Sequence, residues 1–285
     1  MLASPVRVIR FLGSLRGGAQ SRLVQASDGH HYVVKFNNNL QGPNLAFNEA
    51  MGTELYRARQ LSVPMWEPLL VTPAFVHDNP DCWISTETGK LRPAPGICFG
   101  SRFVGETEAR VLEILPGTYF ARVLDRMDFW RAWVLDVCAH HADVRQAIFI
   151  ERSGEFEPVF IDHGHLFGGA DGKKQPKAVA SRYLDPRIYP PLLKRDIRRL
   201  KMMRPIDVDR LWHIADNLPE EWKSTSALNN FAHCLNNLSS PQHLASVVDL
   251  IVETFEQDHS RMRNRNLYEP ISIPRIPLMG TYPAT

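Results

Sequence analysis

The sequence lacks the features that mark several protein classes. No run approaches the eighteen consecutive apolar residues of a membrane-spanning helix. Arginines interrupt the apolar residues at the N-terminus, which is unlike a signal peptide. The net charge is only +2 over 285 residues, which argues against bulk nucleic-acid binding but allows a local basic patch. The remaining composition, 44% hydrophobic and 22% charged, is typical of a globular protein with one two-lobed unit or two domains.

Cysteine is scarce and unclustered. The chain has four cysteines, Cys82, Cys98, Cys138 and Cys234, and none of them forms a Cys-x-x-Cys pair. We therefore expect reduced thiols in the core of a cytoplasmic protein, with a disulfide or a zinc set as the alternative.

The first hundred residues have the apolar and turn patterns of strands. We expect strands at 6–12, 22–26, 31–36, 69–71 and 97–104. Ser27-Asp28-Gly29 predicts a hairpin turn between the second and third strands. A helix is expected at 45–60, where apolar residues recur at near-helical spacing, and 77–96 is expected to be an exposed connection.

The rest of the chain has a mainly helical pattern. We expect helices at 108–115 and 128–140, then a hairpin of 147–150 with 158–161 turned at Ser153-Gly154. Further helices are expected to about residue 263, followed by an extended tail with four prolines. Strands first and helices afterwards predict an α+β fold and not an alternation of strand and helix.

Three features of the first half combine into one candidate site. Residues 15–21 form a glycine-bearing loop whose backbone amides could approach phosphate oxygens, although a plain hairpin turn is the alternative. Lys35 lies in an apolar strand, where a buried ammonium needs a partner unless the strand is an edge that turns it to solvent. Glu49, fourteen residues later, could be that partner, or it could face solvent. Taken jointly, the order of loop, lysine and glutamate is that of protein-kinase-type ATP sites.

Two aspartates flank the expected hairpin of the second half. Asp162 directly follows the apolar run Val159-Phe160-Ile161, and Asp143 lies nineteen residues earlier. A hairpin returns the chain to near its start, so both carboxylates could lie on one rim. One could orient a hydroxyl and accept its proton, and the other could bind Mg²⁺ through hard oxygen ligands. A turn or helix-end role is the alternative for Asp143.

Four stretches of the chain carry a resemblance to a known family. They are "RGGAQSRLVQASDGHHYVVKF", "NEAMGTELYRARQLSVP", "GICFGSRFV" and "WVLDVCAHHADVRQAIFIERSGEFEPVFIDHGHLFGG". Over residues 6 to about 170 the chain resembles the HipA-like kinases, relatives of protein kinases whose best-known members are serine kinases of toxin–antitoxin systems. The resemblance implies a bilobal protein-kinase-like fold. It would have a small, mainly β N-lobe at 1–104, a larger helical C-lobe at 105–268 and a C-terminal tail at 269–285.

The resemblance also implies how ATP and Mg²⁺ would be bound. The glycine loop over the phosphates would comprise Gly17, Gly18, Ala19 and Gln20. Lys35 would hold the α- and β-phosphates, Glu49 would orient Lys35, and 97–104 would be the adenine hinge. Asp143 would be the catalytic base, and Asp162-His163-Gly164 would stand where kinases carry their metal-binding Asp-Phe-Gly.

The catalytic loop departs from the family pattern. Ile148 stands where the family has a metal-binding asparagine five positions after the catalytic aspartate, and it cannot bind a metal. Gln146 is the nearest amide and would serve as the metal ligand if the loop were two residues shorter. On strict spacing, Gln146 would instead place His141 at the base position. Both assignments stay open.

Two other functions are compatible with these residues. A kinase fold that binds nucleotide or a partner without catalysis would explain Ile148. A metal-dependent phosphohydrolase would use the carboxylates and histidines between His140 and His165, but the chain has no HExxH motif, and no His-Asp dipeptide lies between these two residues. We favour a cytoplasmic ATP- and Mg²⁺-dependent kinase that transfers phosphate to a Ser or Thr hydroxyl. Its acceptor is unknown, and the resemblance allows an antitoxin-like partner.

Overall fold

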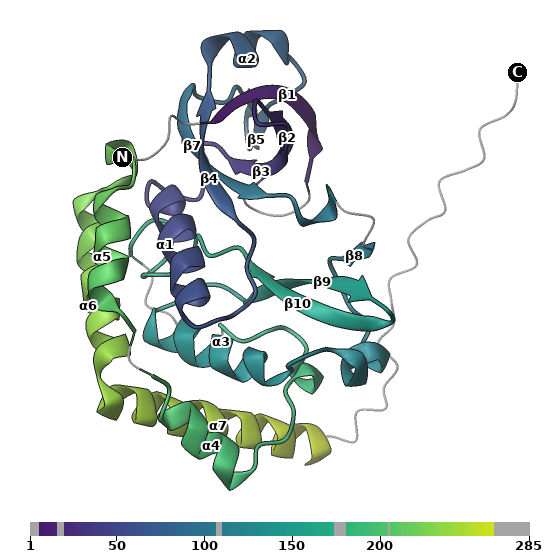
Figure 1. Ribbon diagram of the computed structural model, residues 1–285, viewed down its shortest axis with the longest axis vertical. Coiled ribbons are helices and arrows are strands. Elements are labelled where there is room, and N and C mark those ends of the chain that lie inside the picture. The colour runs from purple at the N-terminus through teal and green to yellow at the C-terminus, as the bar shows by residue number, and fades with distance from the viewer. Residues whose placement is uncertain (1–5, 16–19, 107–109, 174–180, 205, 265–285) are drawn as a thin grey trace, which may run out of the picture.

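The computed structural model describes residues 6–15, 20–106, 110–173, 181–204 and 206–264. These residues combine strands and helices into a mixed α+β fold. A β-barrel lies at one end of the molecule and a group of helices at the other, with α1 (Leu45–Ala58) between them (Figure 1). The predicted tail at 269–285 lies outside the described residues.

The first sheet closes into a barrel of five strands in the order β1-β2-β3-β7-β4. Its strands are β1 (Val6–Ser14), β2 (Arg22–Ala26), β3 (His31–Lys35), β4 (Trp66–Val71) and β7 (Gly96–Arg102). Neighbouring strands are antiparallel except β1 and β4, which are parallel. Alternate side chains such as Val24, Tyr32 and Val34 fill the barrel interior. All five strands were predicted, and so was the hairpin turn between β2 and β3.

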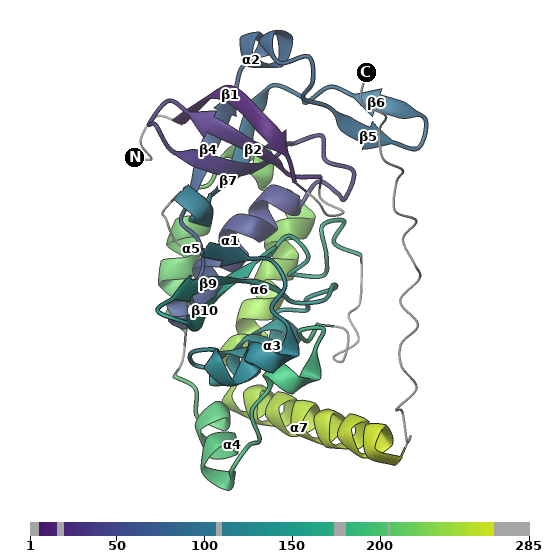
Figure 2. The same cartoon turned by 90° about the vertical axis from the view of Figure 1, so that its right-hand side faces the viewer.

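The segment expected to be an exposed connection, 77–96, contains regular structure. The helix α2 (Pro73–Asp78) runs into it, and β5 (Ile84–Thr86) pairs with β6 (Gly89–Leu91) as a separate hairpin. This hairpin projects sideways from the barrel (Figure 2). Each strand has only three residues, too few for its alternation to be recognised in the sequence. The exposure was predicted correctly for the tip and all of β6, which face solvent, but Cys82 and Ile84 of this segment are buried.

A second sheet has the order β10-β9-β8. The predicted hairpin is present as β9 (Gln146–Arg152) and β10 (Glu155–Ile161). The predicted helix at 108–115 is wrong, because Arg110–Leu112 form the strand β8 against β9. Eight residues are too few to distinguish the two periods, and the open edge of β9 offers backbone partners that the sequence cannot reveal.

Helices make up most of the remaining chain. They are α3 (Met127–Cys138), α4 (Lys194–Lys201), α5 (Val208–Asp216), α6 (Thr225–Ser239) and α7 (Pro241–Asn264). Short 3₁₀ turns occur at Val104–Glu106, Gly117–Arg122, Pro186–Ile188 and Glu220–Trp222. No helix among the described residues is both long and apolar enough to cross a membrane. The four cysteines are buried free thiols, as predicted.

Two hydrophobic clusters divide the core. The smaller one fills the barrel. The larger one joins α3, α5, α6 and α7 with β9 and β10, and it also takes in the apolar face of α1, including Phe47, Met51 and Leu55. The helix that carries Glu49 therefore packs mainly with the helical part of the molecule. The division at residue 104 stays a prediction.

Candidate active site

Lys35 is the last residue of β3, and its ammonium is enclosed by two carboxylates. Its Nζ donates to Glu49 Oε1 and, at 2.6 Å, to Asp162 Oδ1. The Lys35 side chain is only 8% exposed. Burial would lower the pKa of Lys35, but the charges of Asp162 and Glu49 outweigh burial and raise the pKa above its usual value. The expected partner exists, and the edge-strand alternative is wrong because β3 pairs on both sides.

Glu49 is buried on α1 and connects Lys35 to the segment that follows β10. Its carboxylate accepts the backbone N–H of His163 at 3.1 Å and of Gly164 at 2.8 Å. A carboxylate that is desolvated needs several donors, and here it has an ammonium and two amides. Glu49 thus fixes the Asp-His-Gly segment as well as the lysine. The solvent-facing alternative for this residue is excluded by its burial.

Asp162 occupies an unusual backbone conformation at the end of β10. Its φ is 60°, in the left-handed region that costs a residue with a side chain about 1–2 kcal/mol. Burial would raise the pKa of Asp162, but the Lys35 ammonium and its hydrogen bond hold the pKa well below the usual range. Asp162 is therefore ionised at neutral pH, as a metal ligand must be.

Gln146, and not Ile148, lies beside Asp162. Its Nε2 donates to Asp162 Oδ2 at 2.8 Å, and Gln146 is opposite Ile161 in the sheet register. Ile148 is two residues further into β9, opposite Val159. The loop before β9 is therefore short enough to place Gln146 at the rim. This is where the shorter-loop alternative expects the amide, and the role of Gln146 as a metal ligand stays a prediction.

Asp143 lies on the loop between α3 and β9, and its side chain is 48% exposed. Its Oδ2 is 4.0 Å from Nε2 of His165, and the charge of His165 also lowers the pKa of Asp162. His165 therefore interacts electrostatically with both aspartates. His141, the alternative base, is fully buried, and its ring nitrogens have no hydrogen-bond partner among the described residues. Asp143 is thus the better exposed of the two candidate bases.

The glycine loop is described only in part. Gly17, Gly18 and Ala19 lie outside the described residues. Gln20 is described, and its side-chain amide both donates to Ser85 O and accepts from Ser85 N of β5. Because both ends of the amide are engaged, the side chain of Gln20 is held against the β5–β6 hairpin. Any phosphate contact at Gln20 would come from its backbone.

The donor set around Asp162 fits a Mg²⁺ ion that shares its coordination with phosphate. The carboxylate of Asp162 and the amide oxygen of Gln146 are hard ligands, and Mg²⁺ usually takes one or two carboxylates together with water and phosphate oxygens. A half-turn of the Gln146 amide would exchange its nitrogen for its oxygen. In the described part of the chain, no three His, Cys, Asp or Glu side chains are grouped to hold a metal by themselves. The grouping expected of a metal-dependent phosphohydrolase is not found there.

Comparison with known proteins addresses the fold. No protein-family model matches the chain, and no curated protein matches its sequence. The structure is similar to the Helicobacter pylori proinflammatory kinase CtkA, with a TM-score of 0.55 at 12% identity, over 86% of this chain and 99% of that one. It is also similar to hydra Fam20 with sugar, with a TM-score of 0.53 at 10% identity, over 91% of this chain and 87% of that one. The chain has a protein-kinase-like fold.

A buried polar residue that the sequence did not single out contacts the segment after Asp162. Asn48, next to Glu49, donates through Nδ2 to the carbonyls of Gly164 at 3.0 Å, Leu166 at 2.8 Å and Gly169 at 3.2 Å. It thereby holds the segment after Asp162 against α1. A polar residue within the apolar stripe of a helix is the signal that could have identified it.

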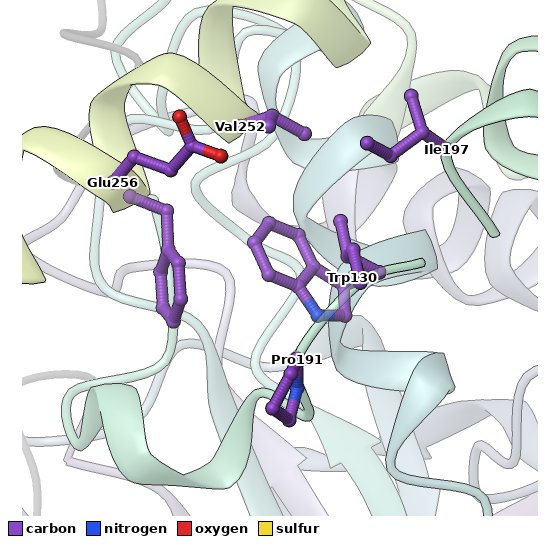
Figure 3. Close-up of a pocket in the computed structure, with 7 residues that line it drawn as sticks. Trp130, Pro191, Ile197, Val252 and Glu256 are labelled. Atoms are coloured by element: carbon purple, nitrogen blue, oxygen red, sulfur yellow. The ribbon is translucent and has the colours of Figure 1, made fainter. Parts of the chain in front are cut away.

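A cavity of about 240 Å³ lies elsewhere in the molecule. Trp130 of α3, Pro191, Ile197 of α4, and Val252 and Glu256 of α7 are among its lining residues (Figure 3). None of its lining residues belongs to the Lys35–Glu49–Asp162 cluster. It is also smaller than the roughly 300–1,000 Å³ usual for ligand sites. The cluster, and not this cavity, is the candidate active site.

Proposed function

We propose that the protein is an ATP- and Mg²⁺-dependent kinase of the HipA-like type that transfers phosphate to a Ser or Thr hydroxyl. The observation that carries the proposal is that Lys35 Nζ contacts both Glu49 and Asp162. The three residues come from β3, from α1 and from the segment after β10. Lys35 and Asp162 are 127 positions apart in the sequence, yet the ammonium of one contacts the carboxylate of the other. Kinases use this combination on the phosphates of ATP.

Lys35 and Glu49 would bind and orient the triphosphate. Lys35 would donate to the α- and β-phosphate oxygens, and Glu49 would hold its ammonium in place through the hydrogen bond already present. The backbone amides of the 15–21 loop would contribute further donors. Catalysis would thus depend on positioning and on charge neutralisation, because phosphoryl transfer requires little covalent chemistry from the protein.

Asp162 and Gln146 would hold the magnesium ion. When bound, Mg²⁺ neutralises charge that develops on the phosphate oxygens. Asp162 would supply an ionised carboxylate to it, since Lys35 holds the pKa of Asp162 low. Gln146 would add its amide oxygen from the adjacent strand end.

Asp143 would orient the acceptor hydroxyl and take its proton. Its exposure leaves the carboxylate accessible to a second substrate, unlike the buried Asp136 and His141. His165 at 4.0 Å would hold the carboxylate in place. Asp143→Asn would keep the shape of the side chain and remove its basicity.

The test is to incubate pure protein with ATP and Mg²⁺ and to measure ADP release and the mass of added phosphate. We expect turnover that is lost with a metal chelator and reduced at least about 100-fold in Asp162→Asn, as when a transition-state contact is removed. Asp249→Asn is the matched control, because Asp249 lies on α7 and pairs with Lys201 outside the candidate site. No turnover, or equal turnover in Asp162→Asn, would contradict the proposal.

A kinase fold without catalysis is the second candidate, and Ile148 favours it. The family asparagine is missing, and the amide of Gln146 now donates to Asp162 instead of presenting oxygen. Nucleotide binding without ADP release, unchanged by Asp143→Asn, would support this candidate.

The finer parts of the proposal rest on the sequence and on the resemblance. They are the HipA-like type, the preference for Mg²⁺, the cytoplasmic location and an antitoxin-like partner. Each stays a prediction, as does the role of 97–104 as an adenine hinge, a range that β7 covers up to Arg102.

A further inference from the structure

An ion pair outside the Lys35 cluster lies buried beside Asp162. Arg145 and Asp136 have side chains that are 1% and 0% exposed. Arg145 contacts the carboxylate of Asp136 twice, through Nε at 2.9 Å and through Nη2 at 2.6 Å. Tyr56 of α1 donates to the same carboxylate at 2.7 Å. A buried pair is tolerable only when its polar atoms are satisfied in this way.

The third nitrogen of the guanidinium serves the end of β10. Nη1 donates to Ile161 O at 3.0 Å and to Asp162 O at 3.4 Å, and it lies 3.3 Å from Nδ1 of His163. These are the residues over which the backbone turns into the left-handed conformation at Asp162. A strained backbone persists only where surrounding contacts determine it.

The same group of residues reaches the helix that carries Glu49. Tyr56 lies two turns beyond Glu49 on α1, and its ring packs 4.5 Å from the ring of His163, centroid to centroid. The Arg145 guanidinium also lies over the Tyr56 ring, 4.8 Å from its centroid. One guanidinium therefore joins α1, α3 and the end of β10.

We propose that Arg145, held by Asp136 and Tyr56, is a positioning residue that sets where the Asp162 carboxylate points. A planar guanidinium can make two bonds to a carboxylate and a further bond to a carbonyl, whereas a lysine ammonium is a single point. The planar guanidinium of Arg145 therefore connects Asp136 of α3 to the end of β10. The consequence for catalysis rests on the proposed kinase function, but the geometry does not.

The first test needs no activity. Folded protein is labelled with a trace of acetic anhydride, and the rate at Lys35 is compared by mass spectrometry with that at exposed Lys194. In Arg145→Lys we expect the relative rate at Lys35 to rise about tenfold, the effect of losing one charge-assisted hydrogen bond from the site. An unchanged rate in folded Arg145→Lys would overturn the proposal.

Two further variants keep the test decisive. Arg131→Lys is the matched control, because Arg131 pairs with Asp128 within α3 and not with the Asp162 segment. This exchange should leave the labelling rate at Lys35 unchanged. If Arg145→Lys fails to fold, Tyr56→Phe decides, because it removes one hydrogen bond from Asp136. We expect a two- to threefold rise there, of the order of one weak hydrogen bond, and no rise would count against the proposal.

The second test separates this proposal from the proposed function. With ATP and Mg²⁺, Arg145→Lys should lower kcat about 100-fold with little change in KM for ATP, as expected of a misplaced group. If Arg145 had a purely structural role, Arg145→Lys would lower the active fraction and the melting temperature of the protein. It would not alter the labelling rate of Lys35 in the folded fraction. If the wild-type protein shows no turnover, the kinase proposal fails, and the labelling result still decides the positioning role.

Discussion

At the scale of single residues, the site depends on one cation between two anions. Lys35, Glu49 and Asp162 are each buried or nearly so, and none of them is tolerable alone. Their pKa shifts follow from this arrangement, with Lys35 raised and Asp162 lowered. Changes at one residue must therefore affect the other two.

Lys35→Met should remove both activity and stability. Glu49 and Asp162 would face each other without a cation, so we expect a loss of about 3–5 kcal/mol in the free energy of unfolding and no detectable phosphoryl transfer. Adding Glu49→Gln should recover part of the stability but none of the activity. Urea unfolding and ADP release measure the two effects, and a fully stable Lys35→Met protein would contradict the prediction.

His141 should make the protein sensitive to mild acid. Burial lowers the pKa of His141 well below 6.5, and the positive charge of Arg145 lowers it further, while Asp162 opposes this effect. Below pH 6.5 the unfolded chain binds a proton that the folded chain does not, so stability falls as pH falls. From pH 7.5 to 5.5 this one group should cost about 1.4 kcal/mol.

The comparison for this prediction is His141→Gln, which does not titrate. Its free energy of unfolding in urea should fall less between the two pH values than that of the wild type, by about 1.4 kcal/mol. Equal pH dependence of both proteins would show that His141 is not buried as a neutral ring.

At the scale of elements, α1 lies unusually close to the segment after β10. A Cβ added to Gly52 would lie 2.5 Å from His163 Cβ and 2.5 Å from Leu166 Cδ1. Asn48 and Glu49 bind the same segment one turn earlier on the helix. The helix therefore sets the position of the Asp-His-Gly segment by close packing as well as by hydrogen bonds.

Gly52→Ala should destabilise the protein in spite of the better helix propensity of alanine. Propensity favours alanine by about 1 kcal/mol, but the clash should cost more and give a net loss of about 1–3 kcal/mol. Gly13→Ala is the matched control, because nothing lies within 4 Å of the added Cβ in β1. Thermal unfolding measures both, and a stabilised Gly52→Ala protein would be inconsistent with this packing.

At the scale of the whole molecule, the larger hydrophobic cluster takes in residues from both sides of residue 104. Phe47, Met51 and Leu55 of α1 pack in the larger cluster, together with residues from the second half of the chain. Burying three such side chains stabilises by roughly 5–9 kcal/mol in all, which is comparable with the total stability of a domain.

Fragments 1–104 and 105–285 should therefore not fold separately. We expect the first, expressed alone, to aggregate or to bind a hydrophobic dye, because the apolar face of α1 has lost its partners. Co-expression of both fragments should recover soluble protein. A soluble 1–104 fragment with a cooperative thermal transition would refute the expectation.

Several elements could be predicted because their signals are local. The barrel strands, α1, α3 and the β9–β10 hairpin follow from periodicity and turn residues within short windows. The helix expected at 108–115 was wrong because β8 is a strand only through its pairing with β9. The β5–β6 hairpin was missed because each strand has three residues. Pairing over long distances and very short elements leave little local trace.

The sequence by itself determined which residues are candidates for the site: Lys35, Glu49, Asp143 and Asp162 were all proposed from residue type and order. Only the tertiary structure decided that Gln146 and not Ile148 lies beside Asp162, because that depends on where the loop ends and β9 begins. Only the structure revealed the contacts that Asn48 and Arg145 make with backbone carbonyls. Carbonyls are the same in every residue, so no sequence pattern identifies them until the chain has folded.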